Sequence, residues 1–470
     1  MSSIENTSPL AIRSILDKQR ASLLERDPLS AAQRIELIDR AIGLLVDYQD
    51  DIVEAVCADF GQRSKDFSRV TEVLSPLMTL KQTKAQLSEW MKPEARHTER
   101  GEAWVQYQPL GVIGILSPWN FPINLAFGGL AGALAAGNRV MIKPSEFTPH
   151  TSALMARMIA SVFSESEVAV ITGGPEVGQA FCAQPFDHLL FTGATSIGKH
   201  VMRAAAENLV PVTLELGGKS PTIISRSADF DAAVTKIITG KLHNAGQICL
   251  APDYVFVPEE SLQDFIAAAK KVVATFFPRL LDNPDYTSLI NARHFQRLQG
   301  YLSQAQAAGV ELIELNPAGE DFSQQDHHKL VPTLLNNPGD DLRVMQDEIF
   351  GPLLPIKPYK TIAEVVAYIN AHPRPLGLYY FGSDEAEEQL VLSRTTSGGV
   401  TLNDVIRHVG VESLPFGGVG PSGMGAYHGR DGFRTFSHAK AVLRAADSPD
   451  LMRPPYVEQV RQIVSSLITR

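Results

Sequence analysis

A cysteine in the middle of the chain has surroundings that suit a nucleophile. Cys249 closes the stretch "NAGQIC", and Gly246 before it would let the backbone approach a ligand closely. Nucleophilic work requires the thiolate, and a free thiol has a pKa near ~8.5, so a neighbouring group must stabilise the anion or remove the proton. A cysteine among small and apolar residues is more often a packing residue. From these residues alone, both interpretations of Cys249 stay open.

Two polar side chains in apolar stretches could assist such a thiol. Glu215 lies in "LELGGKSP" at the end of a predicted strand, where partial burial would raise its proton affinity and suit a general base. Asn120 lies in "SPWNFP", where its amide could donate a hydrogen bond to an oxyanion. For each residue alone, the simpler interpretations are a solvent-facing glutamate and an asparagine in a proline-bounded turn.

A glycine-containing turn could hold the phosphates of a dinucleotide. In "FTGATSIGK", Gly193 and Gly198 lie between a predicted strand and helix, and Ser196 lies near the helix start. The N–H groups at a helix start favour an anion such as a pyrophosphate. The stretch is not GxGxxG, however, and a lone glycine-rich turn is weak evidence.

Two further stretches carry charged and aromatic residues that suit a nucleotide. In "IKPSE", Lys143 could reach a ribose or phosphate, and Glu146 could accept hydrogen bonds from ribose hydroxyls, because doubly wound sheets bind ligands at the carboxyl ends of their strands. In "EIFGP", Glu348 could hold a second ribose and Phe350 could pack on a ring. A surface ion pair and an ordinary turn are the alternatives.

The elements that must position these residues alternate between strands and helices. From residue 111 onward, "GVIGIL", "RVMIK", "VAVIT", "HLLFTG" and "PVTLEL" are predicted strands separated by helices, which predicts a doubly wound parallel sheet of the α/β class. A second series of strands and helices over 221–403 predicts a second α/β domain. Two long helices are predicted before the first sheet, over 30–59 and 66–91, and a last strand is predicted in "GFRTFSHAKAVLR".

Composition excludes several classes of protein. The chain has 470 residues and a net charge of −10, which predicts two or three domains and argues against a nucleic-acid or anionic-membrane surface. No apolar run approaches the ~18 residues of a spanning helix, and the N-terminus lacks the apolar core of a signal peptide. Three widely spaced cysteines predict a reducing, cytoplasmic location, with Cys57 and Cys182 buried in helices. No CxxC or HExxH stretch occurs, so no metal site is predicted.

The order of these stretches along one chain carries a family resemblance. Together, "SPWNFP", "IKPSE", "FTGATSIGK", "LELGGKSP", "NAGQIC", "EIFGP" and "PFGGVGPSGMG" closely resemble the NAD(P)-dependent aldehyde dehydrogenase superfamily, over about 111–443. The tail "GMGAYHGRDGFRTFSHAKAV" resembles the class 3 branch, which includes coniferyl aldehyde dehydrogenases.

The resemblance implies a three-part organisation. Residues 1–214 would form a dinucleotide-binding domain, interrupted by an oligomerisation hairpin near 95–109, and 215–408 would form the catalytic domain. Residues 409–470 would form a return segment and supply an oligomerisation strand. A homodimer is the expected assembly.

The resemblance also implies roles for the residues singled out above. Cys249 would be the nucleophile, Asn120 the oxyanion donor and Glu215 the base. The cofactor would be NAD, with NADP possible, and the residues that bind it would be Trp119, Lys143, Glu146, Gly193, Ser196, Gly198, Glu348 and Phe350. Ala194 departs from the family pattern, because many relatives have a serine at this position that would bind the pyrophosphate.

The predicted reaction is oxidation of an aldehyde to the acid through a cysteine thiohemiacetal and thioester. The substrate would be aromatic or a medium-to-long aliphatic aldehyde, with coniferyl aldehyde as one example. Trp119, Phe121 and Tyr427 could favour an aromatic substrate, or equally belong to the core. The alternatives are a coenzyme A-dependent thioacylating dehydrogenase, a thiol hydrolase and a non-catalytic structural protein.

Overall fold

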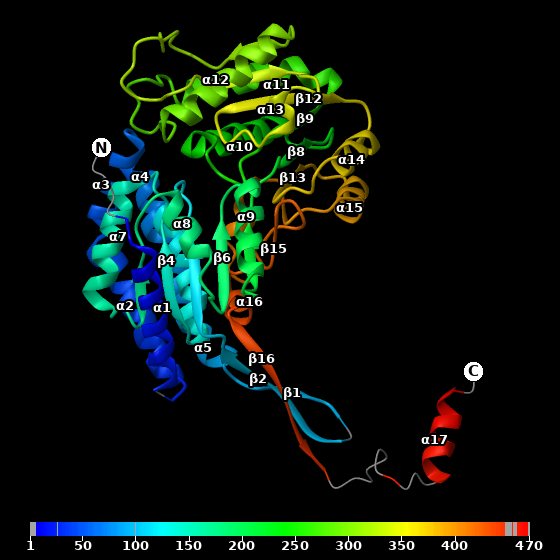
Figure 1. Cartoon of the computed structure of the whole chain (residues 1–470). Coiled ribbons are helices and arrows are strands. Elements are labelled where there is room, and N and C mark those ends of the chain that lie inside the picture. The colour runs from blue at the N-terminus through cyan, green and yellow to red at the C-terminus, as the bar shows by residue number, and fades with distance from the viewer. Residues whose placement is uncertain (1–5, 26, 99, 447–453, 455–457, 469–470) are drawn as a thin grey trace.

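Three β-sheets organise the described part of the chain (Figure 1). The computed structural model describes residues 6–25, 27–98, 100–446, 454 and 458–468. The other positions of the predicted segments 1–214 and 409–470 lie outside the described residues. The sheets have six, seven and three strands, and the two larger ones are mostly parallel. The predicted α/β class with a doubly wound sheet is therefore confirmed.

The six-stranded sheet comes from the first half of the chain and has the order β15-β7-β6-β3-β4-β5. Its parallel strands are β3 (Val112–Leu116), β4 (Arg139–Lys143), β5 (Val168–Val170), β6 (His188–Thr192) and β7 (Val212–Glu215). They are connected by α6 (Pro122–Ala136), α7 (Pro149–Val162), α8 (Pro175–Cys182) and α9 (Thr195–Ala206). A short strand from much later in the chain, β15 (Gly423–Met424), pairs antiparallel with β7.

The predicted helix over 30–59 is wrong in one respect, because the chain forms two helices there. They are α2 (Ala31–Asp47) and α3 (Gln49–Phe60), which follow α1 (Pro9–Leu24). At Tyr48 the backbone leaves the helical region, with φ −103° and ψ 15°, so the chain changes direction without a glycine or proline. Both helices still bury an apolar face in the same cluster, which is why the apolar residues keep near-helical spacing across the turn between them.

The second predicted helix, over 66–91, is helical throughout but not uniform. It consists of α4 (Lys65–Ser68), the wide π-helical turn η1 (Arg69–Leu74) and α5 (Ser75–Trp90). Wide turns of this kind often occur at functional sites, since they redirect a side chain within a continuous helix. Here the redirected side chain is Glu72, which is completely buried.

Both faces of the six-stranded sheet are covered by helices, and alternate residues of each strand face opposite ways. Ile113 and Ile115 of β3 belong to the apolar cluster that includes α2, α5, α6 and α7. Val112 and Leu116 belong to the cluster on the other face, with α1, α8 and α9. Burial on both faces explains why the strands are continuously apolar in sequence.

The seven-stranded sheet has the order β10-β11-β12-β9-β8-β13-β14. Its strands are β8 (Pro221–Ile224), β9 (Tyr254–Pro258), β10 (Glu311–Glu314), β11 (Thr333–Asn336), β12 (Leu353–Tyr359), β13 (Gly377–Phe381) and β14 (Gly399–Leu402). Its helices are α10 (Phe230–Leu242), α11 (Leu262–Phe276), α12 (Ala292–Ala307), α13 (Arg343–Gln346), α14 (Ile362–Asn370) and α15 (Glu385–Arg394). Sequence reasoning missed β12, because Pro355 and Pro358 argue against a strand with neighbours on both sides.

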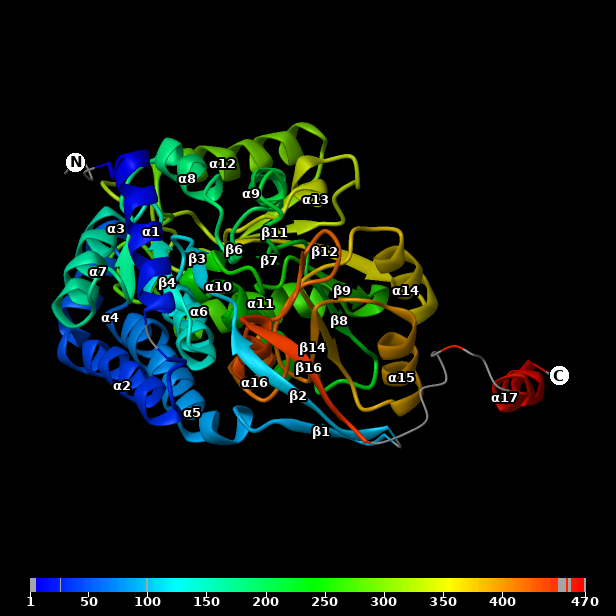
Figure 2. The same ribbon diagram turned by 60° about the horizontal axis from the view of Figure 1, so that its bottom comes forward.

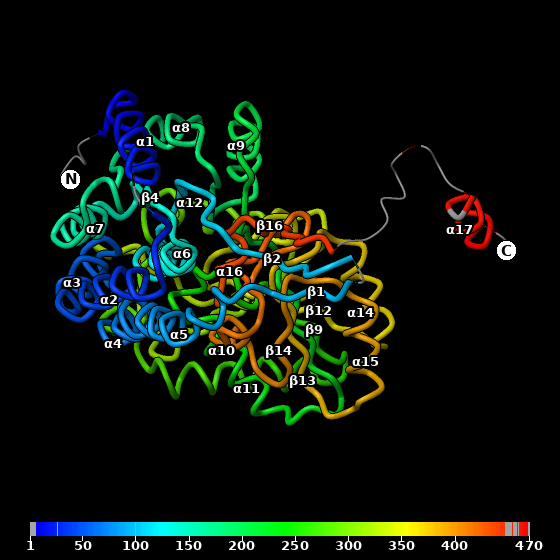
Figure 3. The backbone as a smooth tube through the Cα atoms, turned by 90° about the horizontal axis from the view of Figure 1, so that it is seen from below, coloured from blue at the N-terminus to red at the C-terminus, as the bar shows by residue number. Residues whose placement is uncertain are grey.

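The small sheet projects from the body as a twisted ribbon (Figures 1 and 2). It consists of β1 (Glu94–Arg96), β2 (Gly101–Pro109) and β16 (Ser437–Ala445). The predicted last strand begins later than expected, at Ser437, because the residues before it form the helix α16 (Gly429–Thr435). Seen from below, β2 and β16 run side by side over their whole length (Figure 3).

The remaining helix, α17 (Glu458–Ile468), is exposed along most of its length. Among the described residues, no helix combines the length and apolar character needed to cross a bilayer.

Candidate active site

A cavity of about 910 Å³ is lined by residues that follow strands of both large sheets. From the six-stranded sheet come Asn120 and Gly193, in the segments after β3 and β6, and Glu215, the last residue of β7. From the other sheet's side come Cys249 and Glu348. The structure thus brings the three predicted catalytic residues together, although they are far apart in sequence.

The loop that carries Cys249 has an uncommon backbone. After α10, the short turn η2 (His243–Gly246) places Asn244, Ala245 and Gly246 at φ values of 50°, 51° and 75°. Asparagine tolerates this left-handed region, whereas for alanine it costs about 1–2 kcal/mol. A Cβ at Gly246 would lie 2.3 Å from the carbonyl oxygen of Gly351, so only glycine fits there.

The buried side chain of Gln247 holds this loop in place. Its Nε2 donates to the carbonyl oxygens of Asn244 at 2.9 Å and Ser288 at 3.1 Å. Its Oε1 accepts from the N–H of Ile290 at 3.0 Å. Sequence reasoning missed this residue, and the only available signal was an amide between apolar neighbours in a glycine turn.

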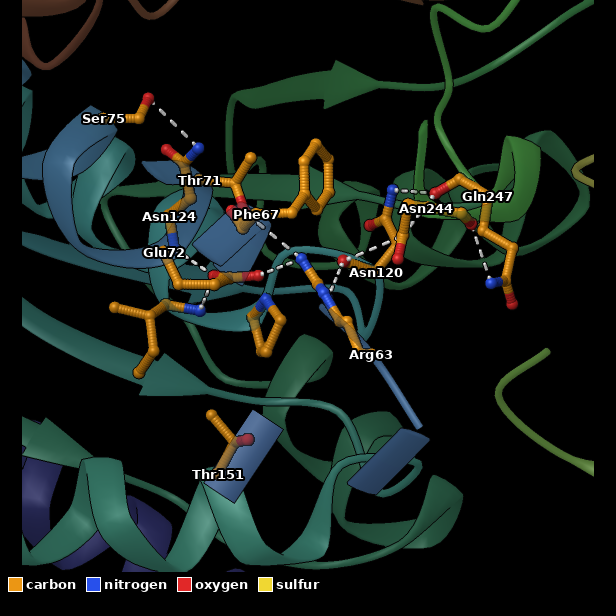
Figure 4. A network of polar contacts seen from close by, with 12 residues as sticks. Arg63, Phe67, Thr71, Glu72, Ser75, Asn120, Asn124, Thr151, Asn244 and Gln247 are labelled. Carbon is orange, nitrogen blue, oxygen red and sulfur yellow. Dashed lines mark hydrogen bonds and ion pairs between the residues drawn. The ribbon is translucent and has the colours of Figure 1, made fainter. Parts of the chain in front are cut away.

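Asn120 joins the loop after β3 to the Cys249 loop (Figure 4). Its Nδ2 donates to the carbonyl oxygen of Gln247 at 3.1 Å. Its own carbonyl oxygen accepts from Arg63 Nη1 at 2.9 Å and from Asn244 Nδ2 at 3.4 Å. The side-chain amide has two N–H groups, and one described residue accepts from it, so one N–H remains for a ligand in the cavity.

Glu215 is held by its backbone at the carboxyl end of β7. Its carbonyl oxygen accepts from the N–H of Gly193 at 3.0 Å, and it pairs with Gly423 of β15 on the other side. Among the described residues, neither of its carboxylate oxygens has a hydrogen-bond partner. Burial without a partner raises the pKa of Glu215 well above its ordinary value.

The surroundings of Cys249 disfavour its thiolate. Burial, together with the charges of Glu348 and Glu215, raises the pKa of the Cys249 thiol to about 12, and burial is the largest of these causes. Of the two possibilities, that a neighbour stabilises the anion or removes the proton, the charges of Glu348 and Glu215 act against the first. Either a base has to remove the thiol proton, or the negative charge on Glu348 and Glu215 has to decrease so that the pKa of the thiol falls.

The two other cysteines differ from each other in exposure. Cys182 is buried in α8, as predicted, and burial raises its pKa to about 11. Cys57 lies in α3 but is only partly buried, so the prediction of a buried Cys57 is wrong. Its Sγ donates to the carbonyl oxygen of Arg63 at 3.1 Å.

Glu348 faces the glycines that follow β7. A Cβ at Gly217 would lie 2.1 Å from both carboxylate oxygens, so glycine leaves room for this carboxylate. Burial raises the pKa of Glu348 to about 8, and the charge of Asp253 acts in the same direction. Asp253 also positions the segment, because its Oδ1 accepts from the N–H of Ile349 at 2.9 Å and its Oδ2 pairs with Lys219.

Most of the predicted cofactor residues line the cavity, namely Trp119, Gly193, Ser196, Glu348 and Phe350. Trp119 packs against Phe350 in a T-shaped contact, with ring centroids 5.3 Å apart. The first turn of α9 has no side-chain cap, since Ala194 occupies that position, and its N–H groups suit an anion. The cavity, the uncapped helix start and the unpaired Glu348 Oε1 fit a dinucleotide.

Three of the predicted cofactor residues lie outside the cavity lining. Lys143 and Glu146 form an ion pair of 3.0 Å at the carboxyl end of β4. Gly198 is buried inside α9, where a Cβ would lie 2.7 Å from the side chain of Leu216, so glycine lets the helix approach the strand end. No group of three metal-ligating side chains occurs in the described part of the chain.

Removing the Glu348 carboxylate tests the electrostatics around Cys249. At pH 9 Glu348 is mostly ionised and raises the pKa of the thiol, whereas at pH 6 it is mostly protonated. We therefore expect Glu348→Gln to accelerate iodoacetamide labelling of Cys249 several-fold at pH 9 and little at pH 6. Peptide mass spectrometry measures the rate, with Cys57 and Cys182 as internal references.

Asp340→Asn is the matched control, because it removes a carboxylate that lines the same cavity but does not act on the thiol. It should leave labelling unchanged at both pH values. An equal effect of Glu348→Gln at pH 6 and pH 9 would contradict the electrostatic cause.

Comparison with known proteins agrees with the motifs. The chain matches the aldehyde dehydrogenase family over residues 2–442. It is 56% identical over 467 residues to a probable coniferyl aldehyde dehydrogenase of Caulobacter vibrioides, covering 97% of this chain and 96% of that protein. It is 52% identical over 461 residues to a coniferyl aldehyde dehydrogenase of Pseudomonas sp. strain HR199, with coverage of 97% and 96%.

A solved structure shows the same fold with a coenzyme. Mycobacterium tuberculosis aldehyde dehydrogenase complexed with NAD+ matches with a TM-score of 0.86 and 26% identity, over 95% of this chain and 96% of that chain. The resemblance drawn from the sequence motifs is confirmed. The chain belongs to the aldehyde dehydrogenase family and is an enzyme that oxidises aldehydes with NAD(P)+.

Proposed function

We propose that Cys249, Asn120 and Glu215 carry out this oxidation, with Cys249 as the nucleophile. The observation that carries the proposal is their meeting in one cavity: Cys249 is the only cysteine of the described chain that lines it, beside an unpaired buried carboxylate and a free amide N–H. A nucleophile, a base and an oxyanion donor are the groups that acyl chemistry on a thiol needs.

In the first step, the Cys249 thiol gives up its proton to a base, and its sulfur attacks the aldehyde carbonyl carbon to form the oxyanion of a thiohemiacetal. The negative charge that develops on the oxygen is held by Asn120 Nδ2 and the N–H of Cys249. In a buried site these hydrogen bonds are stronger than in water, because the local dielectric constant is low.

NAD(P)+, when bound, would supply the acceptor for the hydride whose loss turns the thiohemiacetal into a thioester. Glu348, Trp119 and Phe350 would hold the nicotinamide end near Cys249, and Gly193 and Ser196 would receive the pyrophosphate at the start of α9.

Lys143 and Glu146 would hold the adenosine ribose, with Gly198 allowing close packing behind the turn. The Glu146 carboxylate would repel the additional phosphate of NADP, which favours NAD.

In the second step, Glu215 activates a water molecule that hydrolyses the Cys249 thioester. Burial raises the pKa of Glu215, which makes it a stronger base toward water once it is ionised. Because the protonated form cannot act as a base, the rate of acid release should rise with pH. A base at this position also argues against the coenzyme A-dependent alternative, in which the thiol of coenzyme A, and not water, receives the acyl group.

Replacing the base separates the two steps. Glu215→Gln keeps the shape of the side chain but cannot accept a proton, so we expect one burst of NADH per active site and then a stalled thioester. Intact-mass spectrometry after mixing with NAD+ and benzaldehyde should show the acyl adduct, and Cys249→Ala should show neither burst nor adduct. Steady turnover near the wild-type rate would mean that another group activates the water.

The preferred substrate is proposed to be coniferyl aldehyde or a similar aromatic aldehyde. Two relatives at 56% and 52% identity carry names with this substrate. Phe121, next to the proposed oxyanion donor, is partly buried and contacts Phe67 at 6.3 Å between ring centroids. Tyr427, in contrast, is almost fully buried and belongs to the core.

A substrate panel tests this specificity. We expect kcat/KM to be at least about tenfold higher for coniferyl aldehyde than for acetaldehyde, because an aromatic ring buries more apolar surface. Initial rates of NADH formation with acetaldehyde, hexanal, benzaldehyde and coniferyl aldehyde measure it, each with and without coenzyme A. Equal or better use of hexanal would reject an aromatic specificity.

We further propose that the three sheets mark the nucleotide-binding (1–214), catalytic (215–408) and oligomerisation parts, and that the enzyme is a homodimer. In the described part of the chain, β16 is an outermost strand of the small sheet, and its residues are mostly exposed. Open strand edges are usually covered or paired, which supports an interface along this strand.

Light scattering at micromolar concentration should therefore give the mass of a dimer. Leu443 in β16 is 53% exposed, and Leu443→Asp should shift the mass toward the monomer by placing a charge at the interface. Leu414→Asp, at an exposed leucine outside this strand, is the control and should stay dimeric. A monomeric wild type would reject the proposal.

A further inference from the structure

A completely buried ion pair lies behind the proposed oxyanion donor (Figure 4). Arg63 Nη2 and Glu72 Oε1 are 2.9 Å apart, and neither side chain has any exposed surface. Desolvating two charges is costly, and a buried ion pair is weak evidence for stability. What the pair holds in place is therefore the more informative question.

Arg63 fixes the peptide group of Asn120. Its Nη1 donates to the Asn120 carbonyl oxygen at 2.9 Å, while its Nη2 also reaches Thr71 Oγ1 at 3.3 Å. The guanidinium lies over the rings of Phe60 and Phe121, at 4.8 Å and 5.1 Å from their centroids. Phe121 is the next residue in the chain, so Arg63 contacts both sides of the same peptide segment.

Glu72 holds the other end of this segment. Its Oε2 accepts from the N–H groups of Ile123 and Asn124, each at 3.1 Å, in the first turn of α6. The wide turn η1 places Glu72 at this position. The segment from Asn120 to Asn124 is thus attached to one ion pair at both ends.

We propose that Arg63 and Glu72 are positioning residues that set the Asn120 amide for the oxyanion. The inference rests on the proposed role of Asn120. An oxyanion donor has to lie within about 2.7–3.1 Å of the charged oxygen. Asn120 Nδ2 already donates to the carbonyl oxygen of Gln247, two residues before Cys249. A shift of the Asn120 backbone would therefore move the side-chain amide away from the position of the oxyanion.

The chemistry of arginine fits this task. Its planar fork donates to three acceptors here, namely Asn120 O, Thr71 Oγ1 and Glu72 Oε1. Lysine keeps the charge and could still pair with Glu72, but it is a point charge without the fork. Arg63→Lys therefore separates positioning from charge.

A double-mutant cycle between Arg63→Lys and Asn120→Ala tests the inference. We expect Arg63→Lys to lower kcat about tenfold or more, and less than the ~10²–10³-fold loss expected on removing an oxyanion donor. In the Asn120→Ala background, the same change should lower kcat by less than about twofold, because the amide it positions is absent. The Kd for NAD+, measured by fluorescence titration, should stay unchanged.

Arg34→Lys is the matched control. Arg34 is also buried, and its Nη1 donates to the Ala135 carbonyl oxygen at 2.9 Å, at the opposite end of α6 from Asn120. This variant should lower the melting temperature but leave kcat unchanged. If Arg63→Lys does not fold, Glu72→Gln carries the same cycle, because it weakens the attachment of Ile123 and Asn124 without changing side-chain size.

Each outcome decides between positioning and a merely structural role. Non-additive losses in kcat, with unchanged coenzyme affinity, support the inference. Fully additive losses, or an Arg63→Lys enzyme with wild-type kcat, overturn it and leave the proposed function intact. A wild-type kcat in Asn120→Ala overturns both the oxyanion role and the positioning inference.

Discussion

The hydrogen bond from Asn120 Nδ2 to the carbonyl oxygen of Gln247 connects the two halves of the candidate active site. Asn120 follows β3 of the six-stranded sheet, and Gln247 belongs to the loop that continues from α10 to Cys249. Asn244 donates to both of their carbonyl oxygens and closes the same junction. Because Cys249 lies two residues beyond Gln247, this junction sets the distance between the thiol and the amide.

Burial of this junction also influences which groups of the site carry a charge. Burial raises the pKa values of Cys249, Glu215 and Glu348 alike. With its pKa raised to about 8, Glu348 is mostly protonated near neutral pH, which removes negative charge from the place where the proposed oxyanion would form and favours the first step. The proposed second step needs Glu215 ionised, which burial opposes, so burial acts in opposite directions on the two steps.

Local sequence was sufficient to single out the residues that are proposed for catalysis, and insufficient for those that hold them in place. Cys249, Glu215 and Asn120 lie in short motifs, and the structure places them at one cavity. Arg63 and Gln247 were missed, because their significance comes from partners distant in the sequence. Strand β12 was missed for a different reason, because its two prolines argue against a strand although its other residues are mostly apolar.

The sequence by itself determined the alternation of strands and helices, the two-faced burial of the parallel sheets and the family of the enzyme. These follow from hydrophobic period and motif spacing, which are properties of neighbouring residues. Only the tertiary structure decided that the charges of Glu348 and Glu215 act on the Cys249 thiol, that Cys57 is partly exposed and that Arg63 holds the Asn120 peptide. Burial and hydrogen bonding between distant segments depend on how the segments pack, and no local pattern in the chain encodes that packing.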